Sequence, residues 1–153
     1  MSAAVFPSAD VVDRLVAKVP ALRLIGDVAE LQAAIDAQPK ALPAAFVVVS
    51  ERGHTPAGAS GGTQIQKVEV WLSVVLIVAN KRMTATGSEA RRDMDALIAS
   101  VDSALLNWRP DGSNALPLYF SAGRDEAYKP VAGQLTHQRI YQTERRNQLD
   151  RNP

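Results

Sequence analysis

The chain has 153 residues, of which 46% are hydrophobic and 22% are charged, and its formal net charge is +1. This composition predicts one globular domain with a sizeable core, and the near-neutral charge argues against a general nucleic-acid binder, which usually carries a basic excess. The absence of cysteine excludes a disulfide framework and thiolate chemistry.

The N-terminal segment predicts a helix over residues 9–19. Apolar residues recur there at three- and four-residue spacing, Ser8 is placed to accept a hydrogen bond from a free N–H group at the helix start, and Pro20 ends the pattern. The residues before this helix contain no basic segment followed by a long apolar one, so we expect no secretory signal peptide.

A short apolar segment and a second helix follow. Residues 22–25 are a candidate strand, after which Gly26 turns the chain. Asp27 and Glu30 have the spacing of a capping box, with Asp in place of Ser or Thr. They predict the start of a helix that ends before Pro39.

The strongest strand signal in the chain lies over residues 65–79. Its even-numbered positions are apolar from Val68 to Val78, whereas Lys67, Glu69 and Trp71 point to the other face. The apolar segment 45–50 predicts a shorter, buried strand, and the two strands are most simply antiparallel neighbours. The Gly-rich residues 53–64 between them predict a flexible loop that is unusually long for a hairpin.

The second half of the chain predicts one helix and two strands. Apolar residues recur every three or four positions over residues 89–107, with Ser88 as a candidate cap. Residues 116–121 predict a strand, residues 124–133 a polar loop, and residues 134–145 a weakly alternating strand whose polar composition is typical of a sheet edge.

These elements predict an α+β fold, with a mostly antiparallel sheet of four to five strands and about three helices packed on it. We expect one domain over residues 1–145, including the flexible loop over residues 53–64. Residues 146–153 have almost no apolar content, and we expect them to be disordered until the protein assembles.

The sequence offers no convincing catalytic, cofactor-binding or metal site. His54 and His137, the two histidines, have no second histidine or close carboxylate at ligand spacing. The segment GASGG lacks the Gly-Lys-Ser/Thr ending of a phosphate-binding loop and precedes a strand instead of a helix. No G-x-S-x-G motif is present. We therefore expect no enzyme activity and no cofactor.

The candidate functional residues belong to an assembly surface. Trp71 is the best of them, because an aromatic side chain ringed by polar groups is common at protein interfaces. An ordinary core position explains Trp71 about equally well. The expected subunit or tube interface comprises residues of the loop, of the following strand and of the C-terminus: His54, Gly58, Ser60, Gly61, Gly62, Gln64, Lys67, Glu69, Trp71, Arg145 and Arg146.

The order, spacing and composition of the segments resemble those of a known family. The segments are an N-terminal VVDRLVAKVPAL helix, PAAFVVVSERG before a Gly-rich loop, the QKVEVWLSVVLIVAN strand, the RRDMDALIASVDSALLNWRPDG helix and turn, and a final GQLTHQRIYQTER strand. Over about residues 11–145 the chain resembles the tail terminator proteins of long-tailed bacteriophages, which are small α+β subunits.

The resemblance implies a structural virion protein, assembled in the host cytoplasm, that forms a hexameric ring closing the tail tube and joining it to the head. The implied partners are further copies of the chain, the tail tube protein and the head–tail connector, with no membrane and no sequence-specific nucleic acid, although DNA could pass through the ring. Two alternatives stay open. One is another neck or minor tail component, and the other is a small cytosolic ligand-binding domain with residues 53–64 as a lid.

Overall fold

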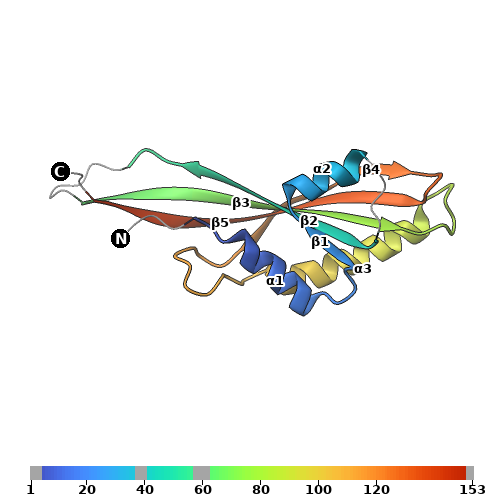
Figure 1. Ribbon diagram of the computed structural model, residues 1–153, viewed down its shortest axis with the longest axis horizontal. Coiled ribbons are helices and arrows are strands. Elements are labelled where there is room, and N and C mark those ends of the chain that lie inside the picture. Colours follow the sequence, from blue (N-terminus) through green and yellow to red (C-terminus); the bar gives the residue numbers. More distant parts are fainter. Residues whose placement is uncertain (1–4, 37–40, 57–62, 151–153) are drawn as a thin grey trace.

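The computed structural model describes residues 5–36, 41–56 and 63–150 (Figure 1). Its helices are α1 (Ser8–Lys18), α2 (Val28–Asp36) and α3 (Ser88–Leu105). Its strands are β1 (Leu24–Gly26), β2 (Ala44–Gly53), β3 (Thr63–Ala79), β4 (Tyr119–Lys129) and β5 (Gln134–Asp150). The helices and strands follow one another in the order that the sequence predicts.

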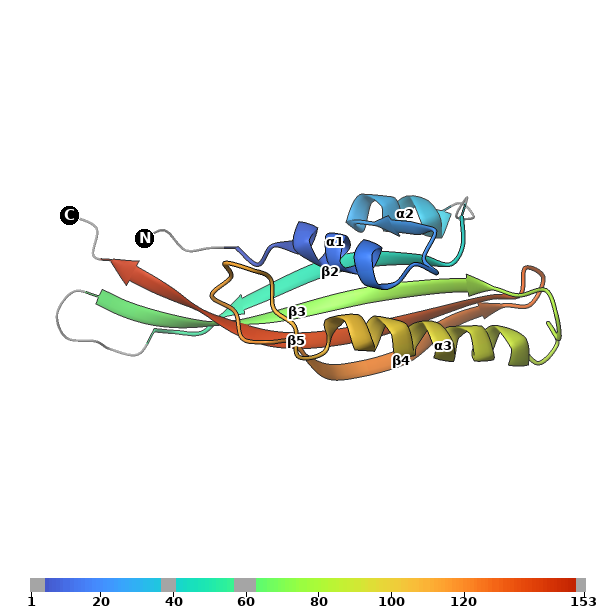
Figure 2. The ribbon, with the colours of Figure 1, turned by 90° about the horizontal axis from the view of Figure 1, so that it is seen from below.

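The strands form one sheet in the order β1-β2-β3-β5-β4. Only β1 pairs in parallel, with β2, and the other pairings are antiparallel. The predicted α+β class with a mostly antiparallel sheet is therefore confirmed. β3 and β5 are the longest strands and pair along their whole length, and they run along the long axis of an elongated molecule (Figures 1 and 2).

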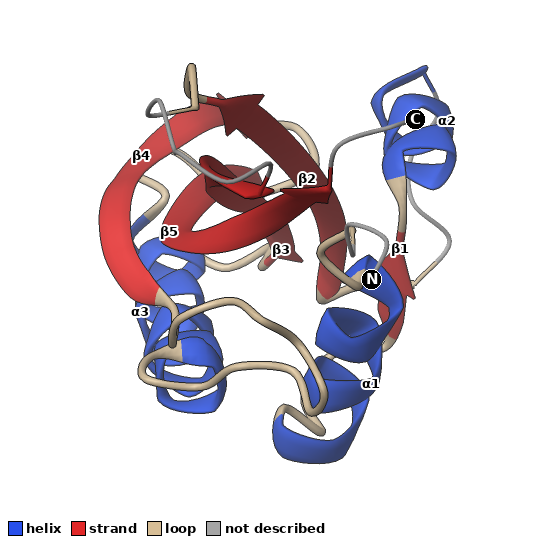
Figure 3. Ribbon diagram, turned by 90° about the vertical axis from the view of Figure 1, so that its left-hand side faces the viewer, coloured by secondary structure: helices blue, strands red, loops and turns tan. Residues whose placement is uncertain are grey.

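The main core lies between one face of the sheet and helices α1 and α3 (Figure 3). The even-numbered side chains of β3 from Val68 to Val78 point into it, and Leu72 and Val74 are fully buried there. Leu15 of α1 and Met94 of α3 are also fully buried. The period-two and period-3.6 patterns of the sequence thus meet in one layer, because each presents a single apolar side.

The opposite face of the sheet is covered only at one end. There α2 packs through Leu31 against a small cluster that includes Phe46 and Ile77. Further along the same face, Trp71 and Ser73 of β3 are partly buried, and neither belongs to the described cluster under α2. This incomplete cover leaves part of the outer face of the sheet exposed.

The last two strands differ from the sequence expectation. β5 lies inside the sheet between β3 and β4, so the prediction that residues 134–145 form an edge strand was wrong. β4 takes the edge instead and continues through most of the predicted polar loop at 124–133. Residues 146–150, expected to be disordered in the isolated chain, extend β5 as strand. Polar composition misled the prediction because both segments obtain their order from backbone pairing and not from apolar burial.

Of the predicted helix caps, one is confirmed and two were wrong. The backbone N–H of Glu30 donates to Asp27 Oδ1 at 3.2 Å, and the N–H of Asp27 donates to Glu30 Oε2 at 2.9 Å, which is the reciprocal pattern of a capping box. Ser8 and Ser88 are instead the first helical residues, and the residues before them make no side-chain cap bond.

The β3–β5 pair extends beyond the rest of the sheet. β2 ends where Gly53 pairs with Val68, but β3 and β5 continue for five more pairs, from Lys67–Arg146 to Thr63–Asp150. We call this two-stranded extension, residues 63–67 and 146–150, the arm. It projects from the body of the molecule on the side where both chain ends lie (Figures 1 and 2).

Candidate assembly surface

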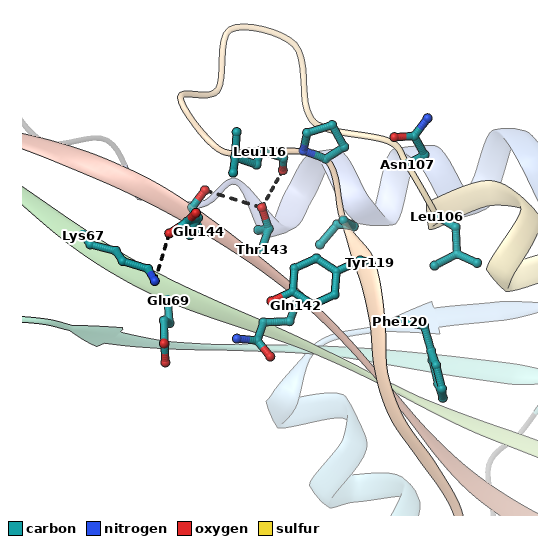
Figure 4. A pocket seen from close by; sticks show the side chains of 12 residues that line it. Lys67, Glu69, Leu106, Asn107, Leu116, Tyr119, Phe120, Gln142, Thr143 and Glu144 are labelled. Atoms are coloured by element: carbon teal, nitrogen blue, oxygen red, sulfur yellow. Dashed lines mark hydrogen bonds and ion pairs between the residues drawn. The ribbon is translucent and has the colours of Figure 1, made fainter.

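An apolar groove lies beside the root of the arm, where β4 begins. Its volume is about 690 Å³. It is formed by the segment that joins α3 to β4, by the start of β4 and by facing residues of β3 and β5 (Figure 4). The residues that line it are Lys67, Glu69, Leu106, Asn107, Leu116, Pro117, Leu118, Tyr119, Phe120, Gln142, Thr143 and Glu144. We call it the root groove.

The segment between α3 and β4 is held firmly although it has no regular structure. Its backbone is tied to β5, because the Leu116 N–H donates to the carbonyl of Glu144 at 2.9 Å and the Thr143 hydroxyl donates to the carbonyl of Leu116 at 2.5 Å. Leu118 is buried and bonds through its N–H to the carbonyl of Trp108 at 2.8 Å. The wall of the root groove is therefore formed before any partner arrives.

The root groove exposes large apolar side chains. Leu116 and Tyr119 are each 53% exposed, Phe120 is 44% exposed and Leu106 is 40% exposed. It is unfavourable for these neighbouring apolar side chains to be exposed to water. Exposed apolar patches of this kind mark interaction sites. The Arg139 guanidinium lies 4.0 Å from the centre of the Phe120 ring, which holds that ring in place.

The rim of the root groove carries paired charges. Lys67 Nζ lies 3.3 Å from Glu144 Oε2, across the first pairs of the arm. His54 Nε2 lies 3.0 Å from Glu69 Oε1, so the second residue of the predicted flexible loop contacts β3. Each of these two carboxylates therefore lies within ion-pair distance of a basic side chain at the rim.

Arg145, one of the expected interface residues, is buried at the base of the arm. Its side chain is only 6% exposed and makes a bidentate ion pair with Glu51, with Nε–Oε1 and Nη2–Oε2 distances of 3.0 and 2.9 Å. Its remaining terminal nitrogen donates to the Asn147 side chain. Glu51 also accepts the backbone N–H of Phe6 at 3.3 Å. Arg145 therefore fixes the base of the arm within its own chain.

This ion pair predicts a specific loss of stability in acid. Hydrogen bonds from the Arg145 guanidinium, which outweigh the opposing effect of burial, hold the pKa of Glu51 below its usual range. Because the folded pKa lies below the unfolded one, the stabilisation is present at neutral pH and is lost as pH falls from the ordinary glutamate range through the lowered folded pKa. We expect Glu51→Gln to lower the free energy of unfolding by about 1–3 kcal/mol at neutral pH, and this difference from wild type to shrink below about pH 4.

Urea unfolding of both proteins across the pH range measures this difference. Glu89→Gln is the control, because Glu89 pairs only loosely with Arg92, at 3.9 Å, and should have little effect at neutral pH. A difference between wild type and Glu51→Gln that stayed constant down to pH 3 would contradict the assigned role of the carboxylate.

The other predicted interface residues are distributed along the arm and its root. Gln64 and Lys67 lie on β3 within the arm, and Arg146 is exposed on β5 opposite Lys67. Trp71 is partly buried on the incompletely covered face of the sheet. Gly58, Ser60, Gly61 and Gly62 lie outside the described residues. The structure thus brings together Lys67, Glu69 and Arg146, while their contact with a partner stays a prediction.

The apolar lining of the root groove was missed by the sequence analysis. Leu116 to Phe120 form the segment LPLYF, which looks like an ordinary buried strand because it is apolar and aromatic. Only Leu118 of this segment is buried in the core, and Leu116, Tyr119 and Phe120 stay exposed. The position of Pro117 inside the segment was the one local sign that it is not a regular strand.

Searches of the described residues for two other kinds of site found neither. These residues contain no group of three or more His, Asp or Glu side chains placed to hold a metal ion. None of the described helices is long and apolar enough to cross a membrane.

One of three comparisons with known proteins identifies a family. Residues 1–151 match the family of phage tail terminator proteins. Among solved structures, the chain is similar to a chain of the virion of a native gene transfer agent particle, with 13% sequence identity and a TM-score of 0.53 over 92% of this chain and 94% of that one. This second likeness shows a shared fold. Among curated proteins, none matches. The chain therefore belongs to the phage tail terminator family and is a structural protein of the virion tail.

Proposed function

We propose that copies of this chain form a closed hexameric ring that terminates the tail tube and presents the surface to which the head and neck join. Family membership supports the tail location. The fold likeness to a chain of a gene transfer agent virion is consistent with a protein built into a particle together with other structural proteins. In this proposal the protein acts through shape and contact, without a catalysed reaction and without a cofactor.

One observation carries the proposal: a single chain presents two different surfaces, the projecting arm and the root groove. A ring requires a heterologous contact, in which one patch of a subunit meets a different patch of the next. The arm is a long projecting element and the root groove is an apolar hollow, so they differ in shape and chemistry as such a contact demands. Closure of the ring then limits growth, which a protein that ends a tube needs.

The proposed partners divide between the two ends of the ring. One end meets the last ring of tail tube protein and the other meets the head–tail connector. The incompletely covered sheet face with Trp71 and the root groove with Tyr119 are the apolar surfaces available for these contacts and for contacts between subunits. Burial of such surfaces in a permanent assembly removes the exposed apolar area that an isolated subunit shows.

Size-exclusion chromatography with light scattering and electron microscopy of the purified chain test the proposal. We expect a discrete ring, either alone or on addition of the tube protein. Tyr119→Ser removes the most exposed aromatic side chain of the root groove, and we expect it to weaken ring formation about tenfold or more. Val131→Ser is the matched control, because Val131 is 99% exposed in the turn between β4 and β5 and lies away from the root groove.

A chain that stays monomeric with and without tube protein, or assembly that is equally insensitive to both substitutions, would contradict the proposal. The same measurements address the ligand-binding alternative. A lid over a small-molecule site would give a monomer whose unfolding temperature rises with a specific ligand and does not depend on tube protein.

A further inference from the structure

Towards its tip, the arm has no backbone hydrogen-bond partner along either long edge among the described residues. In an antiparallel ladder, successive residues direct their backbone groups alternately to the two sides. The N–H of His54 donates to the carbonyl of Lys67, so Lys67 faces β2, and by alternation Ile65 also faces away from β5. On the other edge, the carbonyls of Glu144 and Arg146 accept from Leu116 and the Asn114 side chain, so Gln148 faces outward in turn.

Ile65 and Gln148 mark the same level of the arm, because they are direct partners across it. No backbone group of the other described segments bonds to the outward N–H or C=O of either residue. A two-stranded ribbon without a third strand is at best marginally stable in water. The arm therefore has a backbone hydrogen-bonding surface on each side that an added strand would satisfy.

The other exposed edge of the sheet is protected against such addition. β4 is interrupted by two register shifts, between Phe120 and Ala122 and between Asp125 and Ala127. Charged side chains of β4 lie beside the second register shift, where Arg124 pairs with Glu126 at 2.8 Å. Bulges and charges are the usual means by which proteins prevent unwanted strand pairing. The outer part of the arm has neither, since the register between β3 and β5 is uninterrupted and residues 64–66 and 147–149 carry no charge.

The chemistry of the arm suits a second copy of the same chain. Two strand edges that carry no charge can pair without charge repulsion between side chains that face each other. Six side chains on the outer part of the arm are uncharged: Gln64, Ile65, Gln66, Asn147, Gln148 and Leu149. In addition, β3 and β5 run in opposite directions, so the β3 edge of one arm and the β5 edge of a neighbouring arm are antiparallel when both arms point the same way.

We infer that the arm is a strand-addition site for a second copy, with the β3 edge at Ile65 pairing with the β5 edge at Gln148 of the neighbouring subunit. The exposed Ile65 side chain then lies beside the partner's β5 edge, close to the apolar root groove at the root of that arm. This inference rests on the proposed ring, because it assigns the subunit contact within it.

Charge substitutions at the two kinds of edge test the assignment. Ile65→Lys places a charge on the open edge, and Ser121→Lys places the same charge on the exposed and already protected edge of β4. We expect Ile65→Lys to weaken self-association at least tenfold and Ser121→Lys to leave it nearly unchanged, as measured by light scattering over a concentration series. Gln148→Lys tests the opposite edge and should act like Ile65→Lys.

Cysteine cross-linking identifies the contact directly, because the natural chain has no cysteine. Under mild oxidation, a mixture of the single variants Ile65→Cys and Gln148→Cys should form a mixed disulfide dimer, which can arise only between copies. The double variant should cross-link within one chain, because the two positions are partners in the arm, and it reports that the arm is intact.

Each outcome decides the inference. Reduced association of both lysine variants together with the mixed disulfide supports it. A ring that forms normally with Ile65→Lys and gives no mixed disulfide overturns it while leaving the proposed function standing. Loss of tube binding alone by Ile65→Lys assigns the arm to the tube protein and also overturns it. Arm pairing that produces open chains in place of rings supports it and contradicts the proposed function.

Discussion

Replacing Asp102 with alanine is expected to lower the free energy of unfolding by about 3–5 kcal/mol. Asp102 lies on α3 and accepts hydrogen bonds from two residues of β5, from Arg139 at 2.9 and 2.5 Å and from the Tyr141 hydroxyl at 2.5 Å. Tyr141 is fully buried and Arg139 is 17% exposed. Removal of the carboxylate leaves a mostly buried cation and a buried hydroxyl without their acceptor, and this desolvation is not recovered.

The protonation states in this cluster support the size of the effect. Hydrogen bonding to Asp102 raises the pKa of Arg139, and burial, followed by the Asp102 carboxylate, raises the pKa of Tyr141. Both groups therefore remain donors throughout the pH range in which the protein is studied. The network joins helix to sheet, so its loss should also loosen the packing of α3 on β5.

Chemical denaturation of Asp102→Ala and two companion variants measures this effect. Tyr141→Phe removes one donor and keeps the Arg139 pair, so we expect a loss of about 1.5–3 kcal/mol. Asp95→Ala is the matched control on the same helix. Its carboxylate is 64% exposed and pairs with Arg91 at 3.1 Å, and we expect a change of about 0.5 kcal/mol or less. Equal effects of Asp102→Ala and Asp95→Ala would contradict the network.

Leu15→Ala is expected to lower the free energy of unfolding by about 2–5 kcal/mol. Leu15 is fully buried on α1, where the helix packs against α3 and the sheet. Alanine at this position removes apolar contacts and leaves a cavity that the surrounding side chains fill only partly. Thermal and urea unfolding of the purified variant measure the loss.

The neighbouring residue provides the control for this prediction. Val16 is 62% exposed on the other side of the same helix. We expect Val16→Ala to change stability by no more than about 0.5 kcal/mol, because little burial is lost and alanine has the better helix propensity. Similar losses for both variants would mean that α1 does not pack through the face that contains Leu15.

The secondary structure was largely predictable because its signals are local. The alternation of β3 and the three- and four-residue spacing of α3 are repeated over many residues, so chance patterns contribute little. The capping box at Asp27 is equally local, since its donor and acceptor groups are three residues apart. The caps expected at Ser8 and Ser88 failed because a helix start shifted by one residue removes the required geometry.

The position of each strand in the sheet was not predictable in the same way. β5 looks like an edge strand because many of its side chains are polar, yet it has neighbours on both sides. Some of its polar side chains have hydrogen-bond partners on other elements, as Arg139 has Asp102 and the Nδ1 atom of His137 has Asp125. Composition records the polarity of a side chain but not the partner that the fold supplies.

The candidate assembly surface was likewise predictable from the sequence only in part. The sequence indicated an assembly surface around β3 and correctly located this long strand. It placed Arg145 on that surface, whereas the fold pairs Arg145 with Glu51, 94 residues away along the chain. It predicted only a strand over residues 116–121 and did not indicate that Tyr119 lies exposed beside the root groove.

The amino-acid sequence by itself determined the type and order of the elements and the family resemblance, because short-range apolar spacing decides whether a segment forms a helix or a strand. Only the tertiary structure decided which strand is central, which charged side chains are buried and where β3 and β5 extend beyond the ends of their neighbouring strands. Those properties depend on pairs of residues far apart in the chain, and their register follows from packing the whole sheet against α1 and α3.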